Sequence, residues 1–162
     1  MKTLDLVAKI QICDQKELTD EQKNVVEAAK NATAGSYAPY SHFNVGAAVL
    51  LDNGEIVTGS NQENAAYPSG LCAERTALFY AGHNYPEAKV RKIAVAASVN
   101  GVFTHNICSP CGACRQVMLE SQYRAGEKVE VLLCSATEIY VFDSVDALLP
   151  FGFDYDDLSG EK

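Results

Sequence analysis

The sequence lacks any apolar run long enough to cross a membrane, and it carries little positive charge. No stretch approaches the roughly 18 apolar residues that a membrane-spanning helix needs. Asp5 and Lys9 interrupt the apolar residues of segment 1–12, so the continuous apolar core of a secretory signal is missing. Lysine and arginine number 13 against 21 aspartates and glutamates, a net charge of −8. Because nucleic-acid binding depends on cationic side chains, these absences predict a cytoplasmic protein with a small-molecule ligand, and neither membrane nor nucleic-acid partners.

Internal repeats, low-complexity segments and linkers are also absent. The 162 residues are near the common size of one domain, and we expect a single domain over residues 1–162. In a reducing compartment disulfides are rare, so the six cysteines indicate metal binding or catalysis.

The first half of the chain alternates between strand and helix patterns. Apolar residues at every second position of 4–12 predict a strand. Thr19 and Gln22 match a capping box, which predicts a helix over residues 20–32. The Asn53-Gly54 pair predicts a hairpin between strands at 45–51 and 55–60.

The second half continues this alternation. We expect helices over 72–82 and 111–123, strands over 92–99, 129–133 and 139–142, and a short helix between Ser144 and Pro150. Strands that alternate with helices in this order favour a mixed sheet covered by helices on both faces. The predicted fold class is therefore α/β, a three-layer α/β/α domain.

Three cysteines form the most informative pattern in the chain. Cys72 begins one predicted helix. Cys111 and Cys114, with two residues between them, begin another. Two cysteines at this spacing can bind one zinc ion, and a third from another helix leaves the fourth tetrahedral position open. Three protein ligands and an open position are typical of catalytic zinc, whereas structural zinc is usually closed by four.

Two charged residues follow Cys72 directly. Glu74 lies in the first helical turn, where its carboxylate can accept a proton from a water on the metal and return it to a substrate. Three thiolates and a dication sum to about −1, which disfavours the ionisation of water. A neighbouring guanidinium, that of Arg75, can offset this charge.

These motifs resemble the signatures of the homotetrameric zinc-dependent cytidine deaminases. The resemblance rests on Cys-Ala-Glu-Arg at 72–75 and Ser-Pro-Cys-Gly-Ala-Cys-Arg-Gln at 109–116. Further matches lie at residues 39–43, 45–48, 61–65, 67–68, 148–150 and 153. The resemblance covers roughly residues 28–158. Two features depart from it, an extra N-terminal strand within residues 1–16 and the additional thiol of Cys108.

The resemblance implies hydrolytic deamination of cytidine and deoxycytidine to uridine and deoxyuridine by a cytidine-deaminase-like homotetramer. It implies that Glu74 carries out the proton transfers and that Arg75 lies next to the metal ligands. The residues that it assigns to the nucleoside are Phe43 at the pyrimidine, Asn61 and Glu63 at the ribose 3′-hydroxyl, the main chain near Ala73 at the base edge, and Tyr67 and Phe153 at a neighbouring subunit's site.

Other interpretations of the cysteines stay open from the residues alone. Cys108, Cys111 and Cys114 also match the beginning of an iron–sulfur ligand run, although position 118 is methionine. Adding Cys108 to the three predicted ligands would give a closed structural zinc, and Cys111 with Cys114 alone would fit a redox pair. A deaminase of another base-like compound and a non-catalytic zinc module are the alternative functions.

Overall fold

The computed structural model of the chain describes residues 1–160. Its strands are β1 (Ile10–Cys13), β2 (Phe43–Leu51), β3 (Ile56–Ser60), β4 (Val90–Val99), β5 (Val102–Phe103), β6 (Glu130–Cys134) and β7 (Ile139–Phe142). Its α-helices are α1 (Asp20–Ala32), α2 (Ala73–Asn84), α3 (Gly112–Ala125) and α4 (Tyr155–Ser159). Short 3₁₀ turns are η1 (Thr33–Gly35), η2 (Tyr67–Ser69) and η3 (Val145–Ala147).

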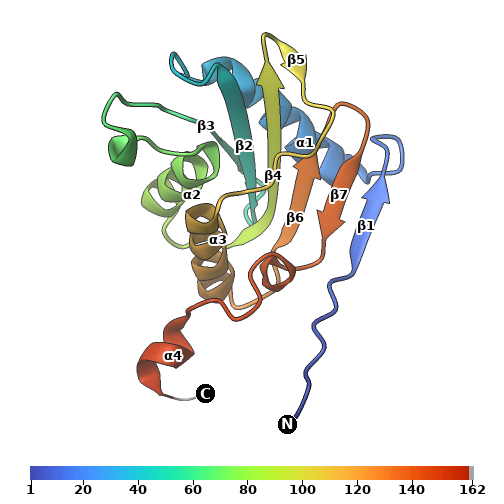
Figure 1. Cartoon of the computed structure of the whole chain (residues 1–162), viewed down its shortest axis with the longest axis vertical. Coiled ribbons are helices and arrows are strands. Elements are labelled where there is room, and N and C mark those ends of the chain that lie inside the picture. The colour runs from blue at the N-terminus through green and yellow to red at the C-terminus, as the bar shows by residue number, and fades with distance from the viewer. Residues whose placement is uncertain (161–162) are drawn as a thin grey trace.

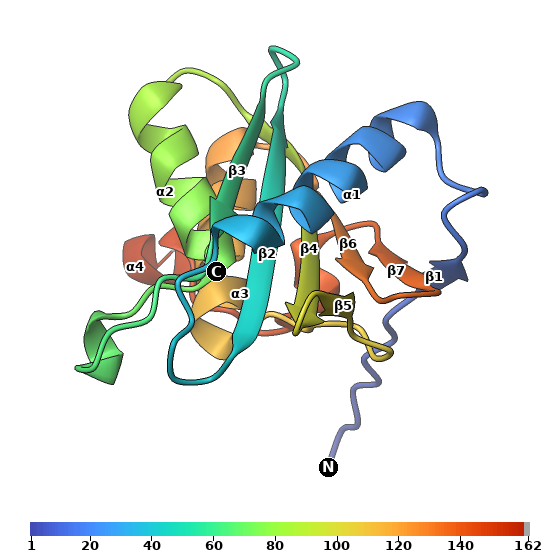
Figure 2. The same cartoon turned by 90° about the horizontal axis from the view of Figure 1, so that it is seen from above.

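The sheet is mixed, and helices cover both of its faces. Its strand order is β1-β7-β6-β4-β2-β3, with β5 paired to β4. Strands β4 and β6 run parallel, and the other pairs are antiparallel. Helix α1 lies on one face, while α2 and α3 lie side by side on the other (Figures 1 and 2). The predicted three-layer α/β/α arrangement is confirmed.

Glycines in the central hairpin let the helices approach the sheet closely. A Cβ on Gly46 would lie 2.2 Å from the Ala29 carbonyl oxygen of α1. A Cβ on Gly59 would lie 2.5 Å from the Ala77 nitrogen of α2. Because α2 carries part of the cysteine cluster, the missing side chain of Gly59 helps to set the position of that cluster.

Several predicted boundaries were wrong, among them those of the first strand and of α2. The alternating pattern predicts a strand over 4–12, but only Ile10–Cys13 pairs with β7, which is itself only four residues long. The helix expected to end by Gly82 continues to Asn84. No helix among residues 1–160 is long and apolar enough to span a bilayer.

Candidate metal centre

The three predicted ligands lie at the starts of the two adjacent helices. Cys72 is the N-cap of α2 and Cys111 the N-cap of α3, and Cys114 is buried in the first turn of α3. The carbonyl oxygen of Cys72 accepts from the Thr76 nitrogen at 3.0 Å, which begins the helical ladder of α2. The backbone is extended at each cap, where the chain turns into its helix, and the two caps meet although they lie 39 positions apart in the sequence.

The sulfur positions suit a tetrahedral zinc ion. The Cys72 and Cys111 Sγ atoms are 3.9 Å apart, those of Cys111 and Cys114 are 3.5 Å apart, and all three lie within 4.8 Å of one another. Zn–S bonds of about 2.3 Å at tetrahedral angles require sulfurs about 3.8 Å apart. The donor set therefore fits zinc, and three sulfurs leave one tetrahedral position for a water or a substrate atom.

Cys108 is not part of this group of sulfurs. Burial, followed by the nearby charges of Glu74 and Cys72, raises the pKa of the Cys108 thiol to about 12. The raised pKa does not distinguish Cys108 from the ligands, because a hydrogen bond with Cys72 and burial also raise the pKa of the Cys114 thiol. The positions of the sulfurs do distinguish it. Among the described residues the geometry thus favours three sulfur ligands over the closed four-cysteine site and over the iron–sulfur run.

Arg75 lies beside the first ligand. Its Nη2 donates to the Cys72 Sγ at 3.7 Å. Hydrogen bonds from Cys114 and then from Arg75 lower the pKa of the Cys72 thiol to about 5, despite the opposing effect of burial. The predicted contact between this guanidinium and a ligand sulfur is therefore present in the structure.

Glu74 lies in the first turn of α2, and only 4% of its surface is exposed. Burial is the largest effect on its carboxyl group and raises the pKa, and the charge of Cys72 acts in the same direction. Burial thus shifts this carboxyl group in the direction that favours its protonated form, and a general acid–base residue has to use both forms.

Asn61 and Glu63 organise the loop that leads into β2. The Asn61 side chain donates to the Phe43 carbonyl oxygen at 2.9 Å and accepts from the Val45 nitrogen at 2.8 Å. Glu63 accepts from the Tyr40 nitrogen at 2.9 Å and from the Ser41 hydroxyl, and this hydroxyl contributes most to the lowered pKa of Glu63. Their contacts with a ribose stay a prediction.

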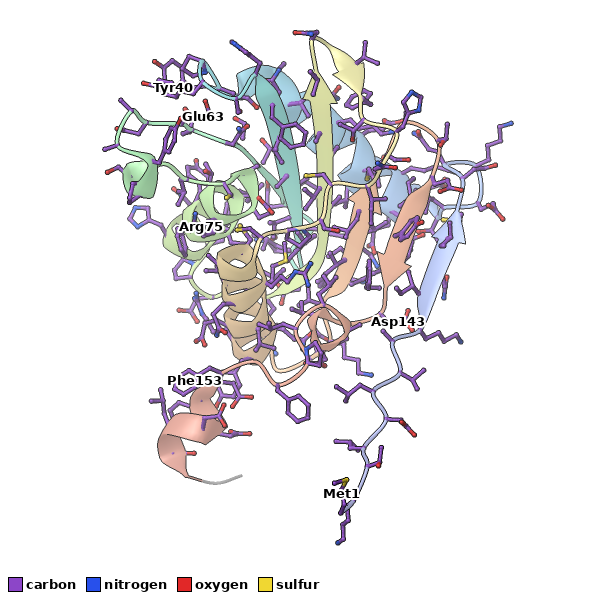
Figure 3. All side chains as sticks on the ribbon, in the orientation of Figure 1. Met1, Tyr40, Glu63, Arg75, Asp143 and Phe153 are labelled. Carbon is purple, nitrogen blue, oxygen red and sulfur yellow. The ribbon has the colours of Figure 1, made fainter. Side chains whose placement is uncertain are left out.

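Tyr67 and Phe153 are exposed and lie away from each other in the fold. Tyr67 is 74% exposed in η2, and Phe153 is 57% exposed just before α4. Figure 3 shows Phe153 below Arg75, at the approach to α4. The amide of Gln116 donates to the Phe153 carbonyl oxygen at 2.6 Å, a contact that the Cys-Arg-Gln motif did not reveal.

Arg115 is a second residue whose role the sequence did not predict. Its guanidinium donates to the carbonyl oxygens of Pro110 at 2.9 Å and Leu148 at 2.8 Å. These bonds fix the residue that precedes Cys111, so Arg115 supports the second half of the metal centre. Its position directly after Cys114 was a sequence signal that could have indicated this supporting role.

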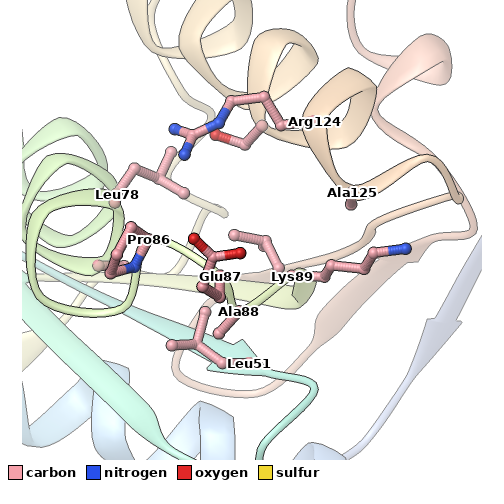
Figure 4. A pocket seen from close by; sticks show the side chains of 12 residues that line it. Leu51, Leu78, Pro86, Glu87, Ala88, Lys89, Arg124 and Ala125 are labelled. Carbon is pink, nitrogen blue, oxygen red and sulfur yellow. The ribbon is translucent and has the colours of Figure 1, made fainter.

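A cavity of about 230 Å³ lies near the other ends of α2 and α3. Leu78, Glu87 and Arg124 are among its lining residues, and Figure 4 shows the Arg124 guanidinium reaching over it. Because the predicted ligands lie at the N-terminal ends of these helices, the cavity is separate from the metal centre.

The comparisons with known proteins agree on one family. The family model for the cytidine and deoxycytidylate deaminase zinc-binding region matches residues 19–127. A cytidine deaminase of Halalkalibacterium halodurans is 37% identical over 148 residues, which span 86% of this chain and 98% of that protein. A cytidine deaminase of Sporosarcina psychrophila is 39% identical over 86% of this chain and 96% of its own.

Solved structures give the same result. The crystal structure of cytidine deaminase from Burkholderia pseudomallei has a TM-score of 0.67 and 39% identity, over 84% of this chain and 100% of that chain. That of Mycobacterium tuberculosis has a TM-score of 0.65 and 32% identity, over 84% and 98%.

Proposed function

The chain belongs to the cytidine and deoxycytidylate deaminase family, and from that premise we propose how its residues share the work of deamination. It is a zinc-dependent enzyme that hydrolyses the amino group of cytidine. The observation that supports this assignment of roles is the cluster of Cys72, Cys111 and Cys114 sulfurs at the helix start that also carries the buried carboxyl group of Glu74.

We assign zinc to these three sulfurs. Zinc supplies a Lewis acid that lowers the pKa of a bound water molecule to about 7. Arg75 withdraws charge from the Cys72 sulfur through the hydrogen bond described above. This contact offsets the negative charge of the three thiolates, which would otherwise make a water molecule at the site less acidic.

Glu74 moves the protons. It accepts one proton from the attacking water and donates it to N3 of the cytosine ring as oxygen bonds to C4. It then transfers the remaining proton of that oxygen to the amino nitrogen, and the C4–N bond breaks to release ammonia and leave uridine. Its burial supports this role, because one carboxyl group has to serve as base and acid in turn.

The nucleoside contacts that we propose come from the start of β2, the segment after β3 and the start of α2. Phe43 packs against the pyrimidine, Asn61 and Glu63 bind the ribose 3′-hydroxyl, and the main chain near Ala73 binds the base edge. Contact with the 3′-hydroxyl but not the 2′-hydroxyl would admit deoxycytidine as well as cytidine. The hydrogen bonds that hold Asn61 and Glu63 in one loop support this arrangement.

We further propose a homotetramer in which neighbouring subunits complete each site. Tyr67 and Phe153 are large aromatic side chains that their own chain leaves exposed. This exposure supports their contribution to another subunit. The single domain, the cytoplasmic location and the absence of nucleic-acid partners stay predictions.

Two variants test the ligand assignment. The purified protein is incubated with cytidine, and the ultraviolet change from cytosine to uracil is followed together with zinc content. Cys111→Ser should lose zinc and turnover, whereas Cys108→Ser should keep both. Loss of zinc from Cys108→Ser would favour a closed four-cysteine site, and zinc without any cytidine turnover would favour the non-catalytic zinc module.

A further inference from the structure

The N-terminal arm, defined here as residues 1–13, leaves apolar side chains uncovered. Leu4 is 72% exposed, Leu6 59%, Ile10 40% and Ile12 56%. Figure 1 shows the arm leaving β1 and running away from the body of the molecule. The family model begins at residue 19, so the arm lies outside the matched region.

The arm also presents a free sheet edge. Strand β1 pairs with β7 on one side only, and no strand among residues 1–160 pairs with its other side. An exposed edge strand has unpaired backbone donors and acceptors, which readily pair with another strand.

The exposed apolar residues of the arm share one face. Ile10 lies opposite Phe142 and Ile12 opposite Tyr140 in the β1–β7 register. Directly opposed residues point to the same face of a sheet, so Ile10 and Ile12 lie on the α3 side with Phe142. If the strand continued towards the N-terminus, Leu4 and Leu6 would lie on that same face.

The arm sequence is complementary to itself in antiparallel pairing. In a register centred on Val7, Asp5 of each strand lies opposite Lys9 of the other, and Leu4 lies opposite Ile10. Opposite charges and apolar side chains that face each other directly stabilise a strand pair. Among residues 1–160, neither Asp5 nor Lys9 has a hydrogen bond or an ion pair.

The charges select one register. Centring the pair on Leu6 or on Ala8 keeps the apolar face together, but it places Asp5 opposite Val7 or Gln11 and loses both ion pairs. A pair centred on one residue has twofold symmetry, as in isologous contacts between identical subunits.

We propose that the arm pairs antiparallel with the arm of a second copy of this chain, about a twofold axis at Val7. The contact places the apolar side chains of the two arms beside one another on one face and pairs the free edge of β1. It lies outside the metal centre and goes beyond the proposed deaminase activity.

Zero-length carbodiimide cross-linking of the full chain tests this pairing, because it joins a carboxylate to an amine only where the two are in contact. We expect a covalent dimer on a denaturing gel, with Asp5 joined to Lys9. Within one extended arm these residues lie four positions apart, roughly 13 Å along the strand, so the link has to form between chains. The Lys92–Glu130 ion pair, at 2.9 Å, is the internal positive control for the chemistry.

Charge variants make the test specific. Asp5→Asn should abolish the covalent dimer, and the matched variant Asp14→Asn should retain it. Asp5→Lys alone should also lose the dimer, whereas Asp5→Lys combined with Lys9→Asp should restore it, because the exchanged charges again face each other. A Lys92–Glu130 link without any Asp5–Lys9 link among the peptides of the digested protein would overturn the proposal, as would failure of the exchanged charges to restore a link between positions 5 and 9.

Discussion

Replacing Glu74 by glutamine should separate metal binding from catalysis. Glutamine keeps the size of the side chain and can still make hydrogen bonds in the first turn of α2, where Glu74 is 4% exposed. It cannot accept and release a proton near neutral pH. Because Glu74 is not one of the three sulfur ligands, Glu74→Gln should keep zinc and still bind a nucleoside.

The expected loss follows from the number of proton transfers. General acid–base catalysis by one positioned side chain typically contributes about 10² to 10⁴ in rate. Here one buried carboxyl group serves the attacking water, N3 and the departing amine in succession. The loss should therefore reach about 10⁴ or more, which corresponds to about 5.5 kcal/mol of transition-state free energy.

The assay measures deamination rate, zinc content and nucleoside binding on the same preparation. Glu120→Gln is the matched control. Glu120 is an exposed glutamate of α3, and its replacement by glutamine removes the same charge from the protein. The control should keep full turnover. Zinc-loaded Glu74→Gln with turnover within about tenfold of the parent enzyme would refute the role given to Glu74.

Three other predictions concern the surroundings of the metal centre. Arg75→Gln should fold normally and lose about 10- to 100-fold in turnover or zinc affinity, whereas unchanged turnover across the pH range would show that the guanidinium is dispensable. Phe153→Ala should lower turnover while zinc stays bound, and light scattering should give a tetramer; an active monomer would remove the shared site. Gly59→Ala should lower the free energy of unfolding by about 1–3 kcal/mol in a denaturant titration, because its Cβ would lie 2.7 Å from the Ala73 oxygen. Wild-type stability of Gly59→Ala would mean that α2 can shift freely.

Local signals predicted parts of the fold very closely. The capping box of Thr19 and Gln22 predicted the start of α1, and the structure contains both of its hydrogen bonds. The Asn53-Gly54 turn was also correct, with Gly54 at a positive φ of 89°. These features depend on neighbours in the sequence, so the sequence alone carries them.

Features that depend on distant partners were harder to predict. The length of β1 is set by β7, whose four residues lie more than 120 positions away. Residues 154–157 contain three aspartates and gave no helix signal, yet Asp154 caps α4 by accepting from the nitrogens of Asp156 and Asp157. The clustering of the three cysteines was predicted because cysteine chemistry restricts the interpretation, whereas the contact from Gln116 to Phe153 joins two segments with no such signal.

The origin of the three sulfurs from two helices links the metal to the stability of the whole domain. An unfolded chain cannot keep Cys72 near Cys111 and Cys114, so the complete site exists only after α2 and α3 have packed together. A ligand that binds only the folded state stabilises it by about 2.7 kcal/mol when its free concentration is 100 times its dissociation constant. The midpoint of thermal unfolding should therefore rise with free zinc, and a chelator should lower the unfolding temperature as it removes activity.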